Sequence, residues 1–318
     1  MPVSAGPIPR AADPTLEAAI VRAVAYADIF DFALTPGELM RYLVGSRATT
    51  REVETALAAS AWLGGRISST GGFVMLHGRE ELAATRGGRR AEADLVLPRA
   101  LRYARAVGSL PFVRMVAISG ALAAGNAVPD ADIDLFVVTE PGRLWLARAA
   151  SIAVVRFVAR AGDELCPNYL LAETALELDE RDLYEANELA HLVPVVGRPV
   201  YDRLREANPW VRDLLPNADG APTADPDARR LIPRAVRLAE AGLRSPLGDL
   251  AEAWEQRRKV ARFRAQASEA GPDGDSEAHF AADRCKGHFE SHRRRIRAAY
   301  EQRVRACGVE PLWEVAGE

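Results

Sequence analysis

The pattern of apolar residues in the first eighty positions changes from helical spacing to strand spacing. A first helix is predicted between residues 14 and 32, where apolar side chains recur at Leu16, Ile20, Val24 and Ile29. Further on, RISSTGGFVML (66–76) has two short apolar runs on either side of Gly71 and Gly72, which predicts two short strands joined by a glycine turn. Helices therefore come first, and a hairpin follows them.

Two further helix starts between these elements have the same capping signature. Thr35 precedes Glu38 by three residues, and Thr49 precedes Glu52 by three. In this capping box the threonine side chain accepts a hydrogen bond from the glutamate N–H, and the glutamate side chain accepts one from the threonine N–H. Pro36 also suits the first position of a helix. We therefore expect a helix to begin at each site.

Three short helices followed by a hairpin are the order of elements in a winged helix, so residues 15–78 are expected to form a winged-helix-like module. A DNA-binding helix needs cations or amides on its exposed face. The third helix instead sets Arg51 against Glu52 and Glu54. This composition disfavours DNA binding and leaves a structural or partner-docking role as the alternative.

Three apolar runs in the middle of the chain predict strands: PFVRMVAIS (111–119), IDLFVVT (133–139) and CPNYLLAE (166–173). A helix is predicted from about residue 143 to 161, between the second and the third. Strand, turn, strand, helix and strand describe a small mixed sheet. The fold class is therefore expected to be α+β, with a core at residues 110–216.

Helical spacing returns after this core, at about 182–194, 227–269 and 278–306. Loops rich in Pro, Gly and Asp separate these blocks. The remaining expected divisions of the chain are a disordered N-terminus at 1–14, a linker helix at 79–109 and a C-terminal helical region at 217–318.

Composition narrows the class of protein. The 318 residues are 48% hydrophobic and 27% charged with a net charge of −3, which favours a soluble globular protein over a membrane bundle and gives no overall attraction to nucleic acid. The three cysteines, Cys166, Cys285 and Cys307, are too scattered for a disulfide framework or a cysteine-based zinc site. With no apolar leader or spanning segment, the expected location is the cytoplasm, without a membrane partner.

Candidate chemistry lies in SGALAAGNAVPDADIDLFVVTE (119–140). In a strand, Asp132 and Asp134 share one face. Two neighbouring carboxylates repel each other unless a cation lies between them. Mg²⁺ suits such a site because it prefers one or two carboxylates together with water and phosphates. Gly120 and Ala121 have small side chains, so their backbone N–H groups can approach a triphosphate. Solvated acids at the start of a surface strand are the alternative.

The same stretch resembles the signature of the DNA polymerase β nucleotidyltransferase superfamily, in which a Gly-Ser pair and a short spacer precede Asp, an apolar residue and Asp or Glu. Here Gly120 and Ala121 are followed by ten residues and then by Asp132, Ile133 and Asp134. The resemblance implies a polymerase β-like core, Mg²⁺ or Mn²⁺ on Asp132 and Asp134, and a nucleoside triphosphate (NTP) as substrate. The residues expected beside the nucleotide are Gly120, Ala121 and Asn126.

Two positions depart from that signature. Ala121 stands where the superfamily has serine, so a hydroxyl that helps to hold phosphates is missing. The superfamily has a third carboxylate on the strand after the helix, where this chain has Asn168, with Glu173 and Glu164 less well placed. Asparagine is not a general base near neutral pH.

The sequence therefore leads to one function hypothesis and two alternatives. The first is a nucleotidyltransferase that moves a nucleoside monophosphate from an NTP to an unidentified hydroxyl or phosphate and releases pyrophosphate. Its candidate catalytic residues are Asp132, Asp134, Asn168 and Glu173. The alternatives are a catalytically impaired nucleotide-binding regulatory protein and a winged-helix DNA-binding regulator.

Five blocks of the wider chain are similar to a group of bacterial and archaeal nucleotidyltransferase-domain proteins. The similarity extends over roughly residues 15–300 and implies the fold without a substrate. The blocks are YADIFDFALTPGEL (26–39), LPFVRMVAISGALAAGNAVPDADIDLFVVT (110–139), LCPNYLL (165–171), LYEANEL (183–189) and EANPWVRDLLPN (206–217).

Several polar residues outside the motif have two interpretations each. His288 and His292 are four residues apart on one predicted helical face, a spacing that suits a metal but has no third ligand in view. The arginines from 293 to 297 suit phosphate or a solvated face. The candidates for lining a pocket, with buried caps as the alternative, are Asn187, Glu188, Asn208 and Trp210.

Overall fold

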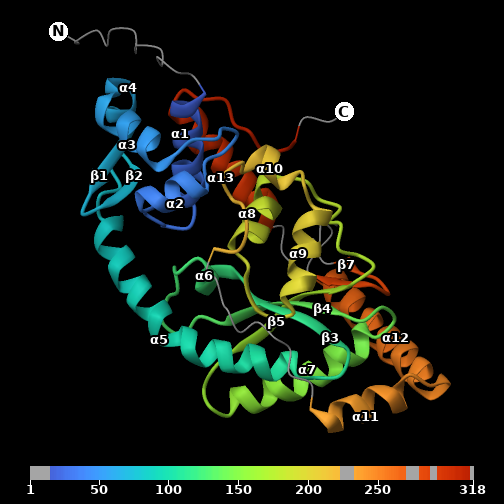
Figure 1. Ribbon diagram of the computed structural model, residues 1–318. Helices are drawn as coiled ribbons and strands as arrows, with labels where there is room; N and C mark the ends of the chain where they lie inside the picture. The colour runs from blue at the N-terminus through green and yellow to red at the C-terminus, as the bar shows by residue number, and fades with distance from the viewer. Residues whose placement is uncertain (1–14, 223–232, 270–278, 287–291, 316–318) are drawn as a thin grey trace.

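The computed structural model describes residues 15–222, 233–269, 279–286 and 292–315 (Figure 1). The disordered segment expected at residues 1–14 lies outside these ranges. The described chain forms a mixed α+β structure in which an N-terminal helical module and a β-sheet are joined by one long helix, α5 (Leu82–Gly108) (Figure 1).

The N-terminal module has helices followed by a hairpin, as predicted, but four helices in place of the expected three, because the third ends at Ser60, which caps a further short helix. Its helices and strands are α1 (Leu16–Asp28), α2 (Pro36–Arg41), α3 (Thr50–Ala59), α4 (Ala61–Gly64), β1 (Ile67–Thr70) and β2 (Phe73–Leu76). Both capping boxes are confirmed, since Thr35 Oγ1 accepts from Glu38 N at 3.2 Å and Thr49 Oγ1 from Glu52 N at 3.3 Å. The antiparallel strands β1 and β2 meet at Gly71 and Gly72, whose φ values of +60° and +81° suit a glycine turn.

The described part of the sheet has six strands in the order β6-β3-β4-β5-β8-β7. Their bounds are β3 (Val113–Ile118), β4 (Ile133–Thr139), β5 (Leu165–Ala172), β6 (Val193–Val196), β7 (His279–Phe280) and β8 (Arg284–Lys286). β3 pairs antiparallel with β4 and β6, whereas β4 and β5 are parallel and joined by the crossover helix α7 (Leu144–Ala159). The predicted mixed sheet is confirmed.

Two apolar cores cover the two faces of the sheet. One core packs α5 and α7 against Val116, Ile118 and Val137 of β3 and β4. The other packs α1 and α8 (Leu183–His191) against alternate residues of the same strands, including Met115 and Phe136. Neighbouring helices α9 (Arg198–Ala207) and α10 (Val211–Leu214) complete this second layer. The N-terminal module and the sheet therefore share a core.

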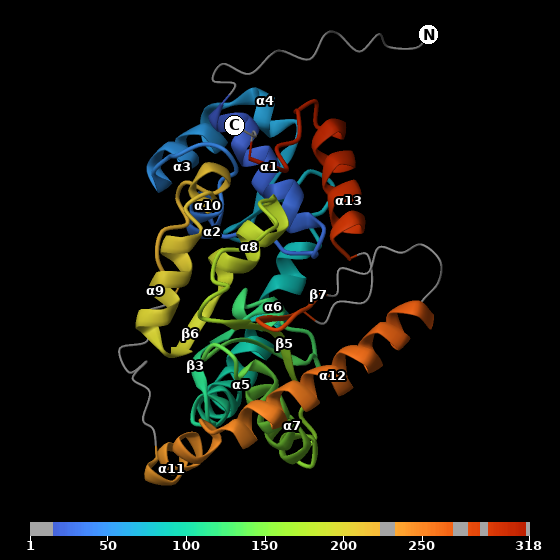
Figure 2. The ribbon, with the colours of Figure 1, turned by 90° about the vertical axis from the view of Figure 1, so that its right-hand side faces the viewer.

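The C-terminal third differs from the expected helical region. Helices α11 (Arg234–Leu243), α12 (Pro246–Glu269) and α13 (His292–Ala306) are present, but residues 279–286 form strands β7 and β8. β8 pairs with Tyr169–Leu171 of β5 and buries Cys285, so this segment extends the sheet. Figure 2 shows α12 beside α7 and α13 beside α1. No helix in the described ranges is long and apolar enough to cross a membrane.

Candidate functional site

The two aspartates lie together at the start of β4. Asp132 is exposed just before the strand, and Asp134 is half-buried within it. Each offers an oxygen within 4.8 Å of the other and of the Cys166 Sγ, which lies opposite Asp134 on β5. The shared face expected from strand alternation brings both carboxylates within reach of one cation.

Gly120 lies directly against this pair. Its φ is +65°, a left-handed value that favours glycine, and a Cβ at this position would overlap the Asp134 carboxylate. The preceding residue, Ser119, donates its N–H to the Asp134 carbonyl at 3.0 Å and so extends the pairing of β3 and β4. The Gly120 backbone and the Asp134 side chain are thus neighbours, as the motif predicts.

Asn168 occupies the position where the third carboxylate was expected. The β4–β5 register shifts there, because Leu135 lies opposite Pro167 and Phe136 lies opposite Tyr169, which leaves Asn168 as the extra residue of a bulge. Its side chain is hydrogen-bonded to the Asp134 carboxyl group. The uncharged amide of Asn168 therefore orients the Asp134 carboxyl group, whereas a carboxylate at position 168 would repel it.

Glu173 does not join this group. Its N–H donates to the Thr139 carbonyl, five residues along β4 from Asp134 and about 17 Å away at the usual rise of a strand. The Glu173 carboxylate forms an ion pair with Arg203. Glu164 is nearer, since its carbonyl accepts from Ile133 N at 2.8 Å, but its side chain is exposed. The third acid expected on this strand is not assembled beside the pair.

A cavity of about 260 Å³ opens beside Asp134. One wall comes from α1 and from the segments that follow α1 and α2, and α6 (Gly120–Ala123), β4, β5 and α8 supply the other, with His292 at the start of α13 also in the lining. Its ring-bearing lining residues are Tyr26, Phe30, Phe32, Tyr42, Tyr184, His191 and His292. Its acidic lining residues are Asp134 and Glu188, and no lysine or arginine lines it among the residues that the structure describes.

One face of α8 forms much of the polar lining. Tyr184, Asn187, Glu188 and His191 are spaced three and four residues apart, which places them on the same side of a helix. Asn187 donates its Nδ2 to the Leu183 carbonyl at 2.8 Å. This spacing was visible in the sequence, but the direction in which the face points was not, because the wall opposite it comes from α1 and from the segments that follow α1 and α2.

Burial changes the protonation of both acids in the cavity. Burial, then repulsion from Asp132 and Glu188, raises the pKa of Asp134 to about 7, while the hydrogen bond from Asn168 opposes the rise. Burial, then repulsion from Glu185, raises the pKa of Glu188 to about 7, against the attraction of Lys286. A cation in the cavity would therefore stabilise the ionised form of either acid.

The neighbouring thiol and imidazole are neutral near pH 7. Burial and the charges of Asp134 and Asp132 raise the pKa of the Cys166 thiol to about 12, so it is a poor metal ligand beside two carboxylates. Burial lowers the pKa of His191 to about 4. The His191 Nδ1–H therefore donates to the Asn187 carbonyl at 2.8 Å, and the ring stacks on Tyr42 with centroids 4.1 Å apart.

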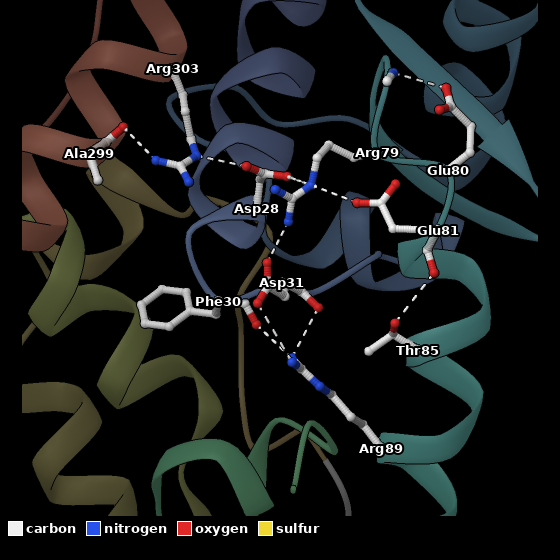
Figure 3. A network of polar contacts seen from close by, with 11 residues as sticks. Asp28, Phe30, Asp31, Arg79, Glu80, Glu81, Thr85, Arg89, Ala299 and Arg303 are labelled. Carbon is white, nitrogen blue, oxygen red and sulfur yellow. Dashed lines mark hydrogen bonds and ion pairs between the residues drawn. The ribbon is translucent and has the colours of Figure 1, made fainter.

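Asn126 lines the cavity but already has partners for its amide. Its Nδ2 donates to the Phe30 carbonyl at 3.0 Å, and its Oδ1 accepts from Arg89 at 3.2 Å. Arg89 also donates to the carbonyls of Phe30 and Asp31 (Figure 3). Asn126 thus fastens the segment after α1 over the cavity, a role that the sequence did not suggest.

A second set of polar contacts holds the module to α13. The buried Asp28 at the end of α1 pairs with Arg303 of α13 at 2.7 Å and with Arg79 at 3.3 Å (Figure 3). Arg79 also pairs with Asp31 and Glu81. These bonds keep the wall formed by α1 in place.

The other polar candidates separate into lining and structural residues. His292 lines the cavity, whereas His288 lies outside the described residues. Asn208 is a buried cap that accepts from Leu178 N at 2.9 Å, and Trp210 donates to it at 3.1 Å. Arg293 is engaged by an ion pair with Glu185 at 2.9 Å.

The arrangement combines two neighbouring carboxylates at the start of β4 with an acidic and aromatic cavity. Backbone and small side chains at Gly120 and Ala121 leave the approach to the carboxylates open. No family model, curated protein or solved structure matches this chain, so its function is inferred from this geometry.

Proposed function

We propose that the protein is a metal-dependent nucleotidyltransferase. The observation that carries this proposal is the contact of a left-handed Gly120 with the second of two carboxylates that share one strand face beside a cavity. Oxygen ligands from Asp132 and Asp134 fit Mg²⁺ or Mn²⁺, whereas the protonated Cys166 thiol does not compete with them. The polymerase β-like core and the winged-helix-like module are parts of this proposal.

The two sides of the acidic pair differ in charge, which supports separate places for the two substrates. Asp134 lines the acidic cavity, but Asp132 is exposed on the outside. Arg148 of α7 opposes the rise in the pKa of the Cys166 thiol, and it lies near Lys259 of α12, whose pKa is lowered by burial and by Arg148. We assign the triphosphate to these cations and the acceptor to the cavity.

The reaction follows from this placement. The acceptor hydroxyl oxygen forms a bond to the α-phosphorus, and the bond from that phosphorus to the bridging oxygen breaks. Pyrophosphate leaves with the electron pair. The hydroxyl proton is released to water, because Asn168 cannot accept it. Asp132 and Asp134, the latter oriented by Asn168, would hold a divalent cation, which would neutralise charge on the phosphates.

Thermal unfolding tests the nucleotide site. We expect Mg²⁺ with an NTP to raise the melting temperature of the wild type by a few degrees, since a ligand at a hundred times its Kd contributes about 2.7 kcal/mol. The double variant Asp132→Asn, Asp134→Asn should lose this shift, and the exposed neighbour Asp130→Asn should keep it. No shift with any NTP, or an equal shift in the double variant, would refute the proposal.

Asn168 favours a second candidate, a nucleotide-binding regulatory protein without turnover. It occupies the position of a catalytic acid and has no basicity. This candidate predicts the same Mg²⁺-dependent thermal shift but no pyrophosphate release with any acceptor tested. Release above the level of the double variant would exclude it. The mixed charges on α3, where exposed Arg51 lies beside Glu52 and Glu54, do not favour DNA binding.

A further inference from the structure

The cavity beside Asp134 has the chemistry of a site for a positively charged organic molecule. It has two carboxyl groups, several aromatic rings and no lysine or arginine among its described lining residues. Carboxylates attract cations by charge, and aromatic faces attract them through the ring quadrupole. A volume of about 260 Å³ lies near the lower end of small-molecule pockets, so the occupant is small.

Glu188 is the acid of the cavity that has no adjacent cation in the part of the chain that the structure describes, since Lys286, which attracts it, is paired with Glu185. Its carboxyl group makes no hydrogen bond or ion pair with any residue in the described ranges. On the preceding turn, Glu185 instead has two cations, Lys286 at 2.8 Å and Arg293 at 2.9 Å. The helix thus pairs the acid that faces the protein with two cations and leaves the acid that faces the cavity without an ion pair among the described residues, an arrangement that favours the entry of a cation.

Arg41, at the end of α2 next to the lining residue Tyr42, has its hydrogen bonds directed away from the cavity. Arg41 lies over the Tyr42 ring at 5.7 Å and donates to the carbonyls of Asp219 and Gly220 at 3.1 and 2.8 Å. It does not line the cavity. On the cavity side, Tyr26 and Phe30 form a tilted pair with centroids 5.5 Å apart. These rings give an apolar, electron-rich surface opposite α8.

We propose that this cavity binds a small hydroxylated organic cation, a primary or quaternary amine, with Glu188 as its counter-ion. The assignment of this molecule as the acceptor rests on the proposed function. In that role its hydroxyl group lies beside Asp134 and its ammonium group lies toward Glu188. A neutral or anionic metabolite, a nucleobase and a polynucleotide are the competing occupants.

Matched pairs of ligands isolate the effect of charge. Choline and 3,3-dimethylbutan-1-ol have nearly the same shape, but only choline is charged, and ethanolamine and propan-1-ol form a second pair. Binding of each to the full chain is measured by isothermal titration calorimetry in Mg²⁺ at about pH 8, where Glu188, with its pKa near 7, is mostly ionised. We expect at least one amine to bind about tenfold more tightly than its neutral partner.

Two variants that each remove one negative charge test whether Glu188 is the counter-ion. Glu188→Gln should abolish the preference for the amine, whereas Glu164→Gln, which removes an exposed acid outside the cavity, should keep it. Melting curves establish that both variants are folded. If neither amine is preferred over its neutral partner, or if Glu188→Gln retains the preference, the proposal is wrong.

The same experiment separates this inference from the proposed function. Binding of amines without a nucleotide-dependent thermal shift would leave a cation site and remove the transferase. A thermal shift that depends on Asp132 and Asp134, with no preference for amines, would keep the transferase and overturn this acceptor class.

Discussion

Replacing Asp134 with asparagine should stabilise the metal-free protein at alkaline pH. The substitution keeps the shape of the side chain and removes its charge. Burial and the neighbouring acids raise the pKa of Asp134 from 3.8 to about 7, so the folded state holds a proton that the unfolded state has released. The free energy of unfolding of the wild type therefore falls as the pH rises from about 4 to about 7, and stays low above that range.

The size of the effect follows from that shift. One pKa unit corresponds to 1.36 kcal/mol, so a shift of about three units sets an upper limit of about 4 kcal/mol. Asp134 is half-buried and borders a cavity that water can enter, which reduces the expected gain to about 1–3 kcal/mol. Near pH 4 the aspartate is protonated in the folded protein, and the difference should vanish.

Urea unfolding in the presence of a chelator measures this gain at acid and alkaline pH. The exposed Asp130→Asn removes the same charge two residues before Asp132, in the turn that precedes β4, and should change stability little at either pH. Saturating Mg²⁺ should reduce the advantage of Asp134→Asn, because only the wild type has both ligands. A variant that is less stable than the wild type at alkaline pH, or a gain that is the same at both pH values, would refute the reasoning.

Three other substitutions test separate parts of the site. Gly120→Ala should lose more stability than Gly142→Ala, by at least about 1 kcal/mol, since both have positive φ but only the first would overlap Asp134; equal losses in urea unfolding would contradict this. Asn168→Asp should raise pyrophosphate release with Mg²⁺ and lower stability without it, and unchanged turnover would show that no base is missing there. Asp28→Asn should lower the free energy of unfolding by about 1–3 kcal/mol, because it weakens the ion pairs with Arg303 and Arg79. A melting temperature equal to that of the wild type would disprove this.

Local signals in the sequence predicted much of the fold. The capping boxes at Thr35 and Thr49 place two helix starts, and the apolar runs place β3, β4 and β5. The pairing of β8 with β5 was missed because three residues, Arg284 to Lys286, are too short to have a readable period. Their burial depends on Tyr169–Leu171, more than a hundred residues earlier in the chain.

The candidate site was predictable only along one strand. Strand alternation brought Asp132 and Asp134 together, and the position of Asn168 followed from the resemblance, although the bulge that turns it toward Asp134 did not. The spacing of Glu188 on its helix could be read from the sequence, but the surface that its side chain faces could not. The wall opposite it comes from α1 and from the segments that follow α1 and α2, and no local pattern predicts that a distant helix will close a cavity.

The contact between the first and the last helix has a consequence for how the protein is made. Tyr26 of α1 packs against Tyr300 of α13 with ring centroids 6.1 Å apart, and Asp28 pairs with Arg303. During synthesis, α1 leaves the ribosome long before its partner exists. α1 can pack early on α2, α3 and β2, but its face toward α13 must wait for nearly the whole chain. Docking of α13 therefore also completes the cavity, because it brings His292 to the lining, and a nascent chain that lacks α13 would leave both the first helix and the cavity incompletely packed.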